Sequence, residues 1–251
     1  MLGKFKLISL SFICLLLGCT TIYNPATERN EIILIDSKSE VALGRNMDRQ
    51  VRQKYEIVDD AAAISRLNRI GQKVAANCDR KDIAYHFSII KDKEFNAFAS
   101  PGGFIYVNSG LIEAATDDEL ACVVAHEIGH VAARHSVKRI QTVLGYQIVM
   151  SIALGLSGAE NVSSAVNVAF NVINLGYSRS DENLADKLSV KYAKRSGFNP
   201  YGMVTFFEKL RKESERKGPR LQIEFLSSHP NIEERIKNVK NEIAKLEQQK
   251  Q

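Results

Sequence analysis

The feature that most constrains this chain is a run of closely spaced histidines, "VVAHEIGHVAARH" at residues 123–135. The 251 residues include only five histidines, and three of them lie in this run. An acidic turn followed by an apolar stretch predicts a helix from about residue 117 to about residue 140. Residues four apart project from the same face of a helix, so His126 and His130 can share one cation.

Glu127 directly follows the first of these histidines, which completes the spacing H-E-x-x-H. In this arrangement two neutral imidazoles bind zinc, and the glutamate takes a proton from the zinc-bound water. The alternative is a pair of core histidines. With so few histidines the pattern arises by chance in roughly one such chain in a hundred, so we predict a metal site.

A catalytic zinc needs a third protein ligand, and His135 is the first candidate to consider. On a continuous helix His135 lies about 180° round the axis from His126, so we expect it to be an exposed or second-face histidine. The metzincin pattern requires a glycine and a histidine where this chain has Ala133 and Ser136, so that pattern fails.

A better candidate lies in "GYSRSDENLADKLSVKYAKRSG" at residues 176–197, which predicts a second helix. Glu182 and Asp186 are four residues apart and share one face of it. Glu182 would complete a His, His, Glu zinc site, and Asp186 could accept the free N–H of a liganding histidine. The alternative is an acidic first turn favoured by the helix dipole. The conjunction with the first helix favours the site.

Three motifs, "AHEIGHVAARH", "YSRSDENLAD" and "SSHPNIEERI", occur in this order. Together they resemble the gluzincin metallopeptidase family of the CAAX prenyl protease and its periplasmic relatives, over about residues 40–245. The resemblance implies one zinc ion per chain. It also implies roles for five residues: the zinc ligands His126, His130 and Glu182, the catalytic base Glu127, and the acidic catalytic partner Asp186.

The third motif places His229 just before a helix that Pro230 and Asn231 open. In one reading His229 is a turn residue. In the other the segment folds over the zinc, so that His229 either fills the open coordination position or stabilises the developing oxyanion, with Arg235 as a nearby cation.

The chain begins with a basic start and an apolar stretch that ends in "LLGC", which resembles the lipobox of bacterial lipoproteins. We therefore expect residues 1–18 to be a lipoprotein signal peptide and Cys19 to carry lipid. An ordinary secretory signal with a chance cysteine is the alternative. By resemblance to sorting rules, Thr20 after the cysteine suggests the outer membrane, facing the periplasm.

After the signal we expect an N-terminal tether at residues 19–39 and one metallopeptidase domain at residues 40–251. The expected fold is α+β and mostly helical, with a small antiparallel sheet near residues 85–110 beside the active-site helix. In an oxidising periplasm Cys78 and Cys122 either pair or remain buried free thiols, and both alternatives stay open.

The formal net charge is +5, and it falls to +3 without Lys4 and Lys6 of the expected signal peptide, which is too small to indicate nucleic-acid binding. The expected function is a lipid-anchored zinc endopeptidase that cleaves misfolded or misassembled periplasmic proteins. Its partners would be protein or peptide substrates, the membrane, and outer-membrane proteins. The rival hypothesis is a chaperone or assembly-factor lipoprotein that keeps the fold without cutting. An intact Glu127 favours the enzyme, because a pure binding protein has no need of a base.

The anchor prediction is tested by Cys19→Ser. This substitution should abolish lipid labelling and leave either an uncleaved precursor or a soluble form, because no thiol remains to be acylated. Metabolic labelling with a fatty acid measures the effect. Normal labelling of the variant would show that the anchor lies elsewhere.

Overall fold

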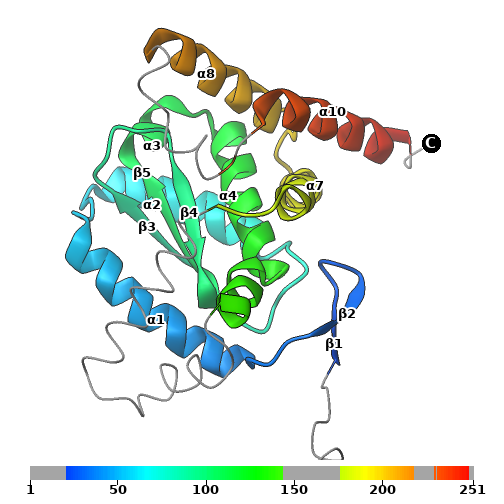
Figure 1. Ribbon diagram of the computed structural model, residues 1–251. Helices are drawn as coiled ribbons and strands as arrows, with labels where there is room; N and C mark the ends of the chain where they lie inside the picture. The colour runs from blue at the N-terminus through cyan, green and yellow to red at the C-terminus, as the bar shows by residue number, and fades with distance from the viewer. Residues whose placement is uncertain (1–20, 144–175, 218–228, 230, 249–251) are drawn as a thin grey trace, which may run out of the picture.

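The computed structural model describes residues 21–143, 176–217, 229 and 231–248 (Figure 1). The predicted signal peptide, Cys19 and the apolar run after Val143 lie outside these ranges. The helices and strands are β1 (Thr21–Asn24), β2 (Arg29–Ile32), α1 (Ser37–Lys54), α2 (Ala61–Ala75), β3 (His86–Ile90), β4 (Ala97–Ser100), the 3-10 turn η1 (Pro101–Gly103), β5 (Phe104–Asn108), α3 (Ser109–Ala114), α4 (Asp117–Ala132), α7 (Arg179–Arg195), α8 (Gly202–Lys217) and α10 (Ile232–Gln248). The predicted α+β class with mainly helical content is confirmed. Among the described residues, no helix has the length and apolar character needed to span a bilayer.

The sheet beside α4 has the strand order β3-β5-β4. β4 and β5 are antiparallel and are joined by the tight turn η1, in which Gly102 and Gly103 have φ angles of 75° and 90° that favour glycine. β3 runs parallel to β5 on the other side, so the sheet is mixed rather than purely antiparallel as the sequence predicted. Alternation along a strand reports which side is buried and not strand direction, which is why the parallel pair was missed.

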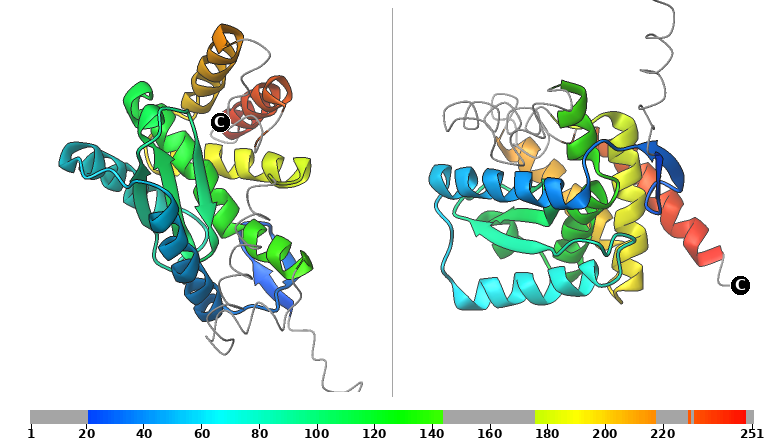
Figure 2. Two further views of the ribbon diagram at one scale, coloured as in Figure 1. Left: turned by 60° about the vertical axis from the view of Figure 1, so that its left-hand side comes forward. Right: turned by 90° about the horizontal axis from the view of Figure 1, so that it is seen from below.

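Helix α4 lies in the middle of the fold, between the sheet and α7 (Figure 2). A capping box between Thr116 and Glu119 begins it, and every residue from Glu119 to Ala132 is buried. A helix that is apolar on most of its circumference must be covered on all sides. The sheet, α2, α7 and α8 supply that cover, and the histidines of the motif are therefore carried into the interior.

The predicted helix over residues 117–140 is interrupted. α4 ends at Ala132, Arg134 takes a left-handed conformation with a φ of 56°, and residues 135–143 form a separate helical segment. The Arg134 guanidinium is buried, forms an ion pair with Glu40 at 3.2 Å and donates to the carbonyl of Ile35. These contacts with the start of α1 hold the turn, and they redirect the chain after α4.

Cys78 and Cys122 are both buried and free, so the unpaired alternative holds. The Cys78 thiol lies 3.0 Å from the carbonyl of Arg80, and the Cys122 thiol lies 3.6 Å from the carbonyl of Asn199. Each thiol therefore has a backbone carbonyl as its partner in a different part of the core.

Candidate metal centre

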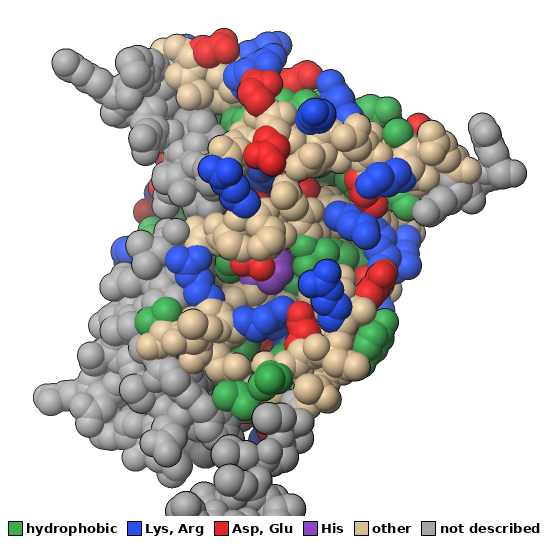
Figure 3. All heavy atoms as spheres, turned by 45° about the vertical axis from the view of Figure 1, so that its right-hand side comes forward, with side chains coloured by type: hydrophobic (Ala, Val, Ile, Leu, Met, Phe, Trp, Pro, Cys, Tyr) green, Lys and Arg blue, Asp and Glu red, His purple; other side chains and the backbone are tan. Residues whose placement is uncertain are grey.

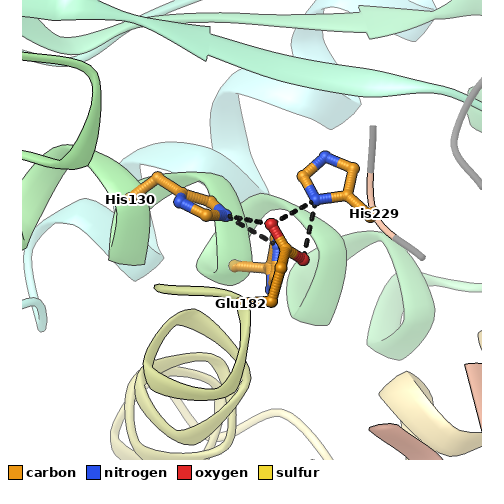
Figure 4. A group of neighbouring side chains, drawn as sticks. His130, Glu182 and His229 are labelled. Atoms are coloured by element: carbon orange, nitrogen blue, oxygen red, sulfur yellow. Dashed lines mark hydrogen bonds and ion pairs between the residues drawn. The ribbon is translucent and has the colours of Figure 1, made fainter. Parts of the chain in front are cut away.

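Four side chains with metal-binding atoms converge in the interior, and Figure 4 labels three of them, with His130 and His229 directed at the carboxylate of Glu182. His126 and His130 come from α4, Glu182 from the first turn of α7, and His229 from the segment before α10. One ligand atom from each lies within 4.8 Å of all the others. All four residues are buried. On the face drawn in Figure 3, only a small area of histidine surface is visible, ringed by Lys and Arg side chains.

The close approach of α4 and α7 brings Glu182 to the histidines. Gly129 lies between the two ligands of α4, and a Cβ there would sit 3.2 Å from Leu188 Cβ and 3.3 Å from the carbonyl oxygen of Ala185. Next along α7, the Ser189 hydroxyl donates to the Cys122 carbonyl at 2.7 Å. The glycine thus permits a short interhelical distance, and the hydroxyl fixes the register of one helix against the other.

The donor atoms face one point. His126 Nε2 and His130 Nε2 are 3.0 Å apart, and the Glu182 carboxylate lies 3.6 Å from the first and 3.4 Å from the second. His229 Nδ1 lies 2.8 Å from both oxygens of the same carboxylate. Two imidazoles and a carboxylate are a donor set that zinc takes in catalytic sites. The residues present therefore fit one zinc ion.

Glu127 is the second observation in favour of that fit. Neither of its carboxylate oxygens has a hydrogen-bond partner among the described residues, and the side chain is fully buried. Burial raises the pKa of this carboxyl group. Buried polar groups normally have partners, and an orphaned one indicates a functional role or a bound species. Glu127 is the group that can exchange a proton beside the donor cluster.

Asp186 and Arg235 lie on the Nδ1 side of the His126 ring, away from the donor cluster. Asp186 Oδ1 lies 2.9 Å from His126 Nδ1, and Arg235 donates to both oxygens of Asp186 at 2.8 and 2.6 Å. Arg235 also lies 3.3 Å from the Glu182 carboxylate. A proton on His126 Nδ1, donated to Asp186, leaves the Nε2 lone pair directed at the cluster. Two carboxylates, those of Asp186 and Glu182, therefore hold Arg235 beside the cluster.

Charges within the cluster set the protonation states. Burial alone lowers the pKa of His126, but the neighbouring carboxylates of Asp186 and Glu182 outweigh it and raise the pKa to about 9. Burial raises the pKa of Glu182, but the neighbouring imidazoles of His229, His126 and His130 outweigh it, and the pKa falls far below its usual range. The pocket thus favours positive charge next to an ionised carboxylate, and a zinc ion bound there would take the place of the histidine proton.

His135 differs from the sequence prediction. It is buried, its Nδ1 lies 2.8 Å from His130 Nδ1, and its Nε2 lies 3.4 Å from Asp181 Oδ1. Burial lowers the pKa of both His130 and His135 to about 3, so both rings are neutral. The expectation of an exposed or second-face residue was wrong because it assumed that the helix continues through Arg134.

Tyr177 is a neighbour of the site that the sequence reasoning did not single out. Its ring stacks on that of His130 with centroids 4.0 Å apart, and its hydroxyl lies 2.7 Å from Ser136 Oγ. The residue stands in the second motif, one position before the serine that caps α7. Only its place in that motif pointed to it, because the contact depends on how α7 meets α4.

A buried H-E-x-x-H helix, packed against a second helix that supplies a glutamate to the same cluster, defines a metallopeptidase of the gluzincin class. The chain matches peptidase family M48 over residues 61–243, and it belongs to that family. The resemblance drawn from the three motifs is therefore confirmed. So is the prediction of one zinc ion per chain, since the family is one of metallopeptidases and the cluster has donors for one ion.

Individual relatives agree with this class. Metalloprotease LoiP of Escherichia coli is 32% identical over 182 residues, which cover 71% of this chain and 70% of LoiP. Metalloprotease YcaL of the same organism is 32% identical over 71% of this chain and 69% of its own length. The β-barrel assembly-enhancing protease of Yersinia pestis is 29% identical over 80% of this chain, and the match spans 43% of that relative's length.

The ligand assignment predicts which of four variants lose zinc and which one retains it. His126→Ala, His130→Ala and Glu182→Ala should each lose stoichiometric zinc, because each removes a donor from the first coordination shell. Glu127→Gln should retain zinc, because it removes a charge that does not coordinate. Elemental analysis of the purified full chain measures this. Stoichiometric zinc in Glu182→Ala would contradict the assignment.

Proposed function

We propose that this chain is a zinc-dependent endopeptidase whose metal ligands are His126, His130 and Glu182. The observation that carries the proposal is Glu127, a fully buried carboxylate without a hydrogen-bond partner beside three converging donors. A binding protein gains nothing from such a group, because a buried carboxylate that accepts no hydrogen bond is destabilising. A hydrolase requires it to move a proton.

Zinc in this cluster would polarise the scissile carbonyl and lower the pKa of a bound water towards neutrality. Glu127 would take a proton from the attacking water at a carboxylate oxygen and deliver it to the leaving amine. Its raised pKa suits both steps, because a base whose pKa lies closer to the working pH can also act as an acid. Asp186 would hold His126 in the tautomer that coordinates through Nε2, with Arg235 keeping Asp186 ionised.

Strand β4 is the best candidate for substrate alignment. Among the described strands it pairs only with β5, and it packs against α4. An extended peptide can add to such an edge by backbone hydrogen bonds with little demand on sequence. Asn96 Oδ1 and Ser100 Oγ, at the two ends of this segment, are buried without hydrogen-bond partners in the described structure. Both polar atoms are enclosed in the fold, so backbone pairing along the strand edge carries this proposal.

His229 would close the site in its resting state. It is buried, belongs to the converging donor set, and its Nδ1 lies against the Glu182 carboxylate. The alternative role, stabilising an oxyanion, gains no support from Arg235, whose guanidinium is bound to Asp186 and Glu182. The geometry therefore favours His229 as a displaceable fourth ligand.

The cellular setting is inferred from the N-terminus and from the relatives. Strand β1 begins two residues after Cys19, so lipid on that cysteine would hold the domain close to the bilayer surface. Several relatives are named for enhancing β-barrel assembly. We therefore place the protein at the periplasmic face of the outer membrane, acting on misfolded or misassembled proteins. A chaperone that binds such proteins without cleaving them remains the rival function.

Casein digestion by wild type and by Glu127→Gln separates the two functions. The variant keeps the shape of the side chain but cannot act as a base, so its turnover should fall by about 10²- to 10⁴-fold with zinc retained. Proteolysis is followed by release of labelled peptides, with zinc content measured on both proteins. A wild-type chain that binds zinc, suppresses aggregation of unfolded proteins and cuts none of them would support the chaperone.

His229→Ala should raise the rate of proteolysis while zinc stays bound, because the other three ligands remain and the open position is freed. Glu234→Ala, an exposed change on the adjoining helix, is the matched control and should leave the rate unchanged. A lower turnover with zinc retained would instead assign His229 to stabilisation of the transition state.

A further inference from the structure

The two histidine ligands of α4 are supported differently on the side away from the cluster. His126 Nδ1 meets a carboxylate directly, 2.9 Å from Asp186. His130 Nδ1 meets another imidazole, 2.8 Å from His135 Nδ1, and the far nitrogen of that ring lies 3.4 Å from Asp181. His130 and His135 are both buried, so water does not compete freely for these nitrogens.

The positions of the protons on His130 and His135 follow from the geometry. Two ring nitrogens 2.8 Å apart cannot both carry a proton, so one donates and the other accepts. A ligand that coordinates through Nε2 carries its proton on Nδ1, so His130 is the donor and His135 Nδ1 the acceptor. The single proton of neutral His135 then lies on Nε2, the nitrogen that faces the Asp181 carboxylate.

We propose that His135 is a positioning residue, which links the carboxylate of Asp181 to the metal ligand His130 and holds that ligand in its coordinating tautomer and orientation. This inference rests on the metal site proposed above and extends it outward. Asp186 accepts the Nδ1 proton of His126 directly. His135 accepts the Nδ1 proton of His130 and connects it to the carboxylate of Asp181. The consequence is higher zinc affinity rather than any contact with substrate.

Surrounding contacts fix the position of the chain of contacts Asp181–His135–His130, which we call the relay. Tyr177 stacks on the His130 ring and is bonded through its hydroxyl to Ser136, the residue after His135. The left-handed turn at Arg134, anchored to Glu40, directs His135 back towards α4. Without this turn the residue would point to the opposite side of the helix, as a continuous α-helix requires.

Asp181 belongs both to the relay and to the first turn of α7. Its carboxylate accepts from the backbone N–H of Ser178, and its own N–H donates to the Ser178 hydroxyl at 3.2 Å, which together form the capping box of α7. The next residue, Glu182, reaches the metal cluster. One helical turn thus supplies a ligand to the zinc and a carboxylate to the support of a second ligand.

The test compares zinc dissociation constants, measured by chelator competition on the full chain. His135→Leu fills the space without an acceptor, and its zinc affinity should fall about 10- to 100-fold. His135→Asn can place an amide oxygen near the position of Nδ1, and its affinity should return towards wild type. Rescue by asparagine but not leucine is a result that a packing role would not produce.

A second pair of variants tests the far end of the relay. Asp181→Asn removes the charge facing His135 but keeps an acceptor for the helix cap, and it should weaken zinc binding. Lys187→Ala changes an exposed charge on the same helix, so it is the control and should leave zinc affinity unchanged. Melting of the metal-free proteins shows which variants fold. If His135→Leu does not fold, this pair decides the question.

The outcomes separate the relay from the metal site itself. A wild-type chain that binds no zinc would contradict the proposed function. If wild type binds zinc and both His135→Leu and Asp181→Asn bind it equally tightly, the relay alone is overturned. Equal weakening by leucine and asparagine at position 135, with Asp181→Asn unaffected, would also overturn it, since packing would then explain the loss.

Discussion

The contact between α4 and α7 at Gly129 is the interaction on which the site depends. It allows two helices to lie close enough for a carboxylate on one to reach two imidazoles on the other. Because α4 is buried on all sides, the same contact encloses these groups away from bulk water. In such surroundings charge–charge interactions are stronger than at a surface, and a cation between the donors is favoured.

Burying so many ionisable groups is destabilising unless each has a partner. Most of them do. Asp186 is paired with Arg235, Glu182 with three imidazoles and Arg235, and His135 with Asp181 and His130. Glu127 is the exception, because its oxygens have no hydrogen-bond partner in the described part of the chain. His229 Nε2 is its nearest charge partner, 3.9 Å away, and a buried carboxylate whose oxygens accept no hydrogen bond is free to take up a proton.

Much of the site followed from local periodicity. The H-E-x-x-H spacing predicted that His126 and His130 share a face, and the four-residue spacing of Glu182 and Asp186 predicted the same on a second helix. The structure brings all four together. It also places His135 against His130, which the sequence did not predict, because the argument relied on a helix that the structure ends at Ala132. The parallel pairing of β3 with β5 was missed for a related reason, since alternation does not report strand direction.

The metal-binding helix, the helix that completes the donor set and the family can all be predicted from the amino-acid sequence, because spacings of three to five residues along the chain encode them. The groups that surround the ligands follow from tertiary contacts. The left-handed turn at Arg134 depends on Glu40, which lies 94 residues earlier in the chain. No local pattern encodes such a contact, since its energy comes from burying two charges together in the folded core.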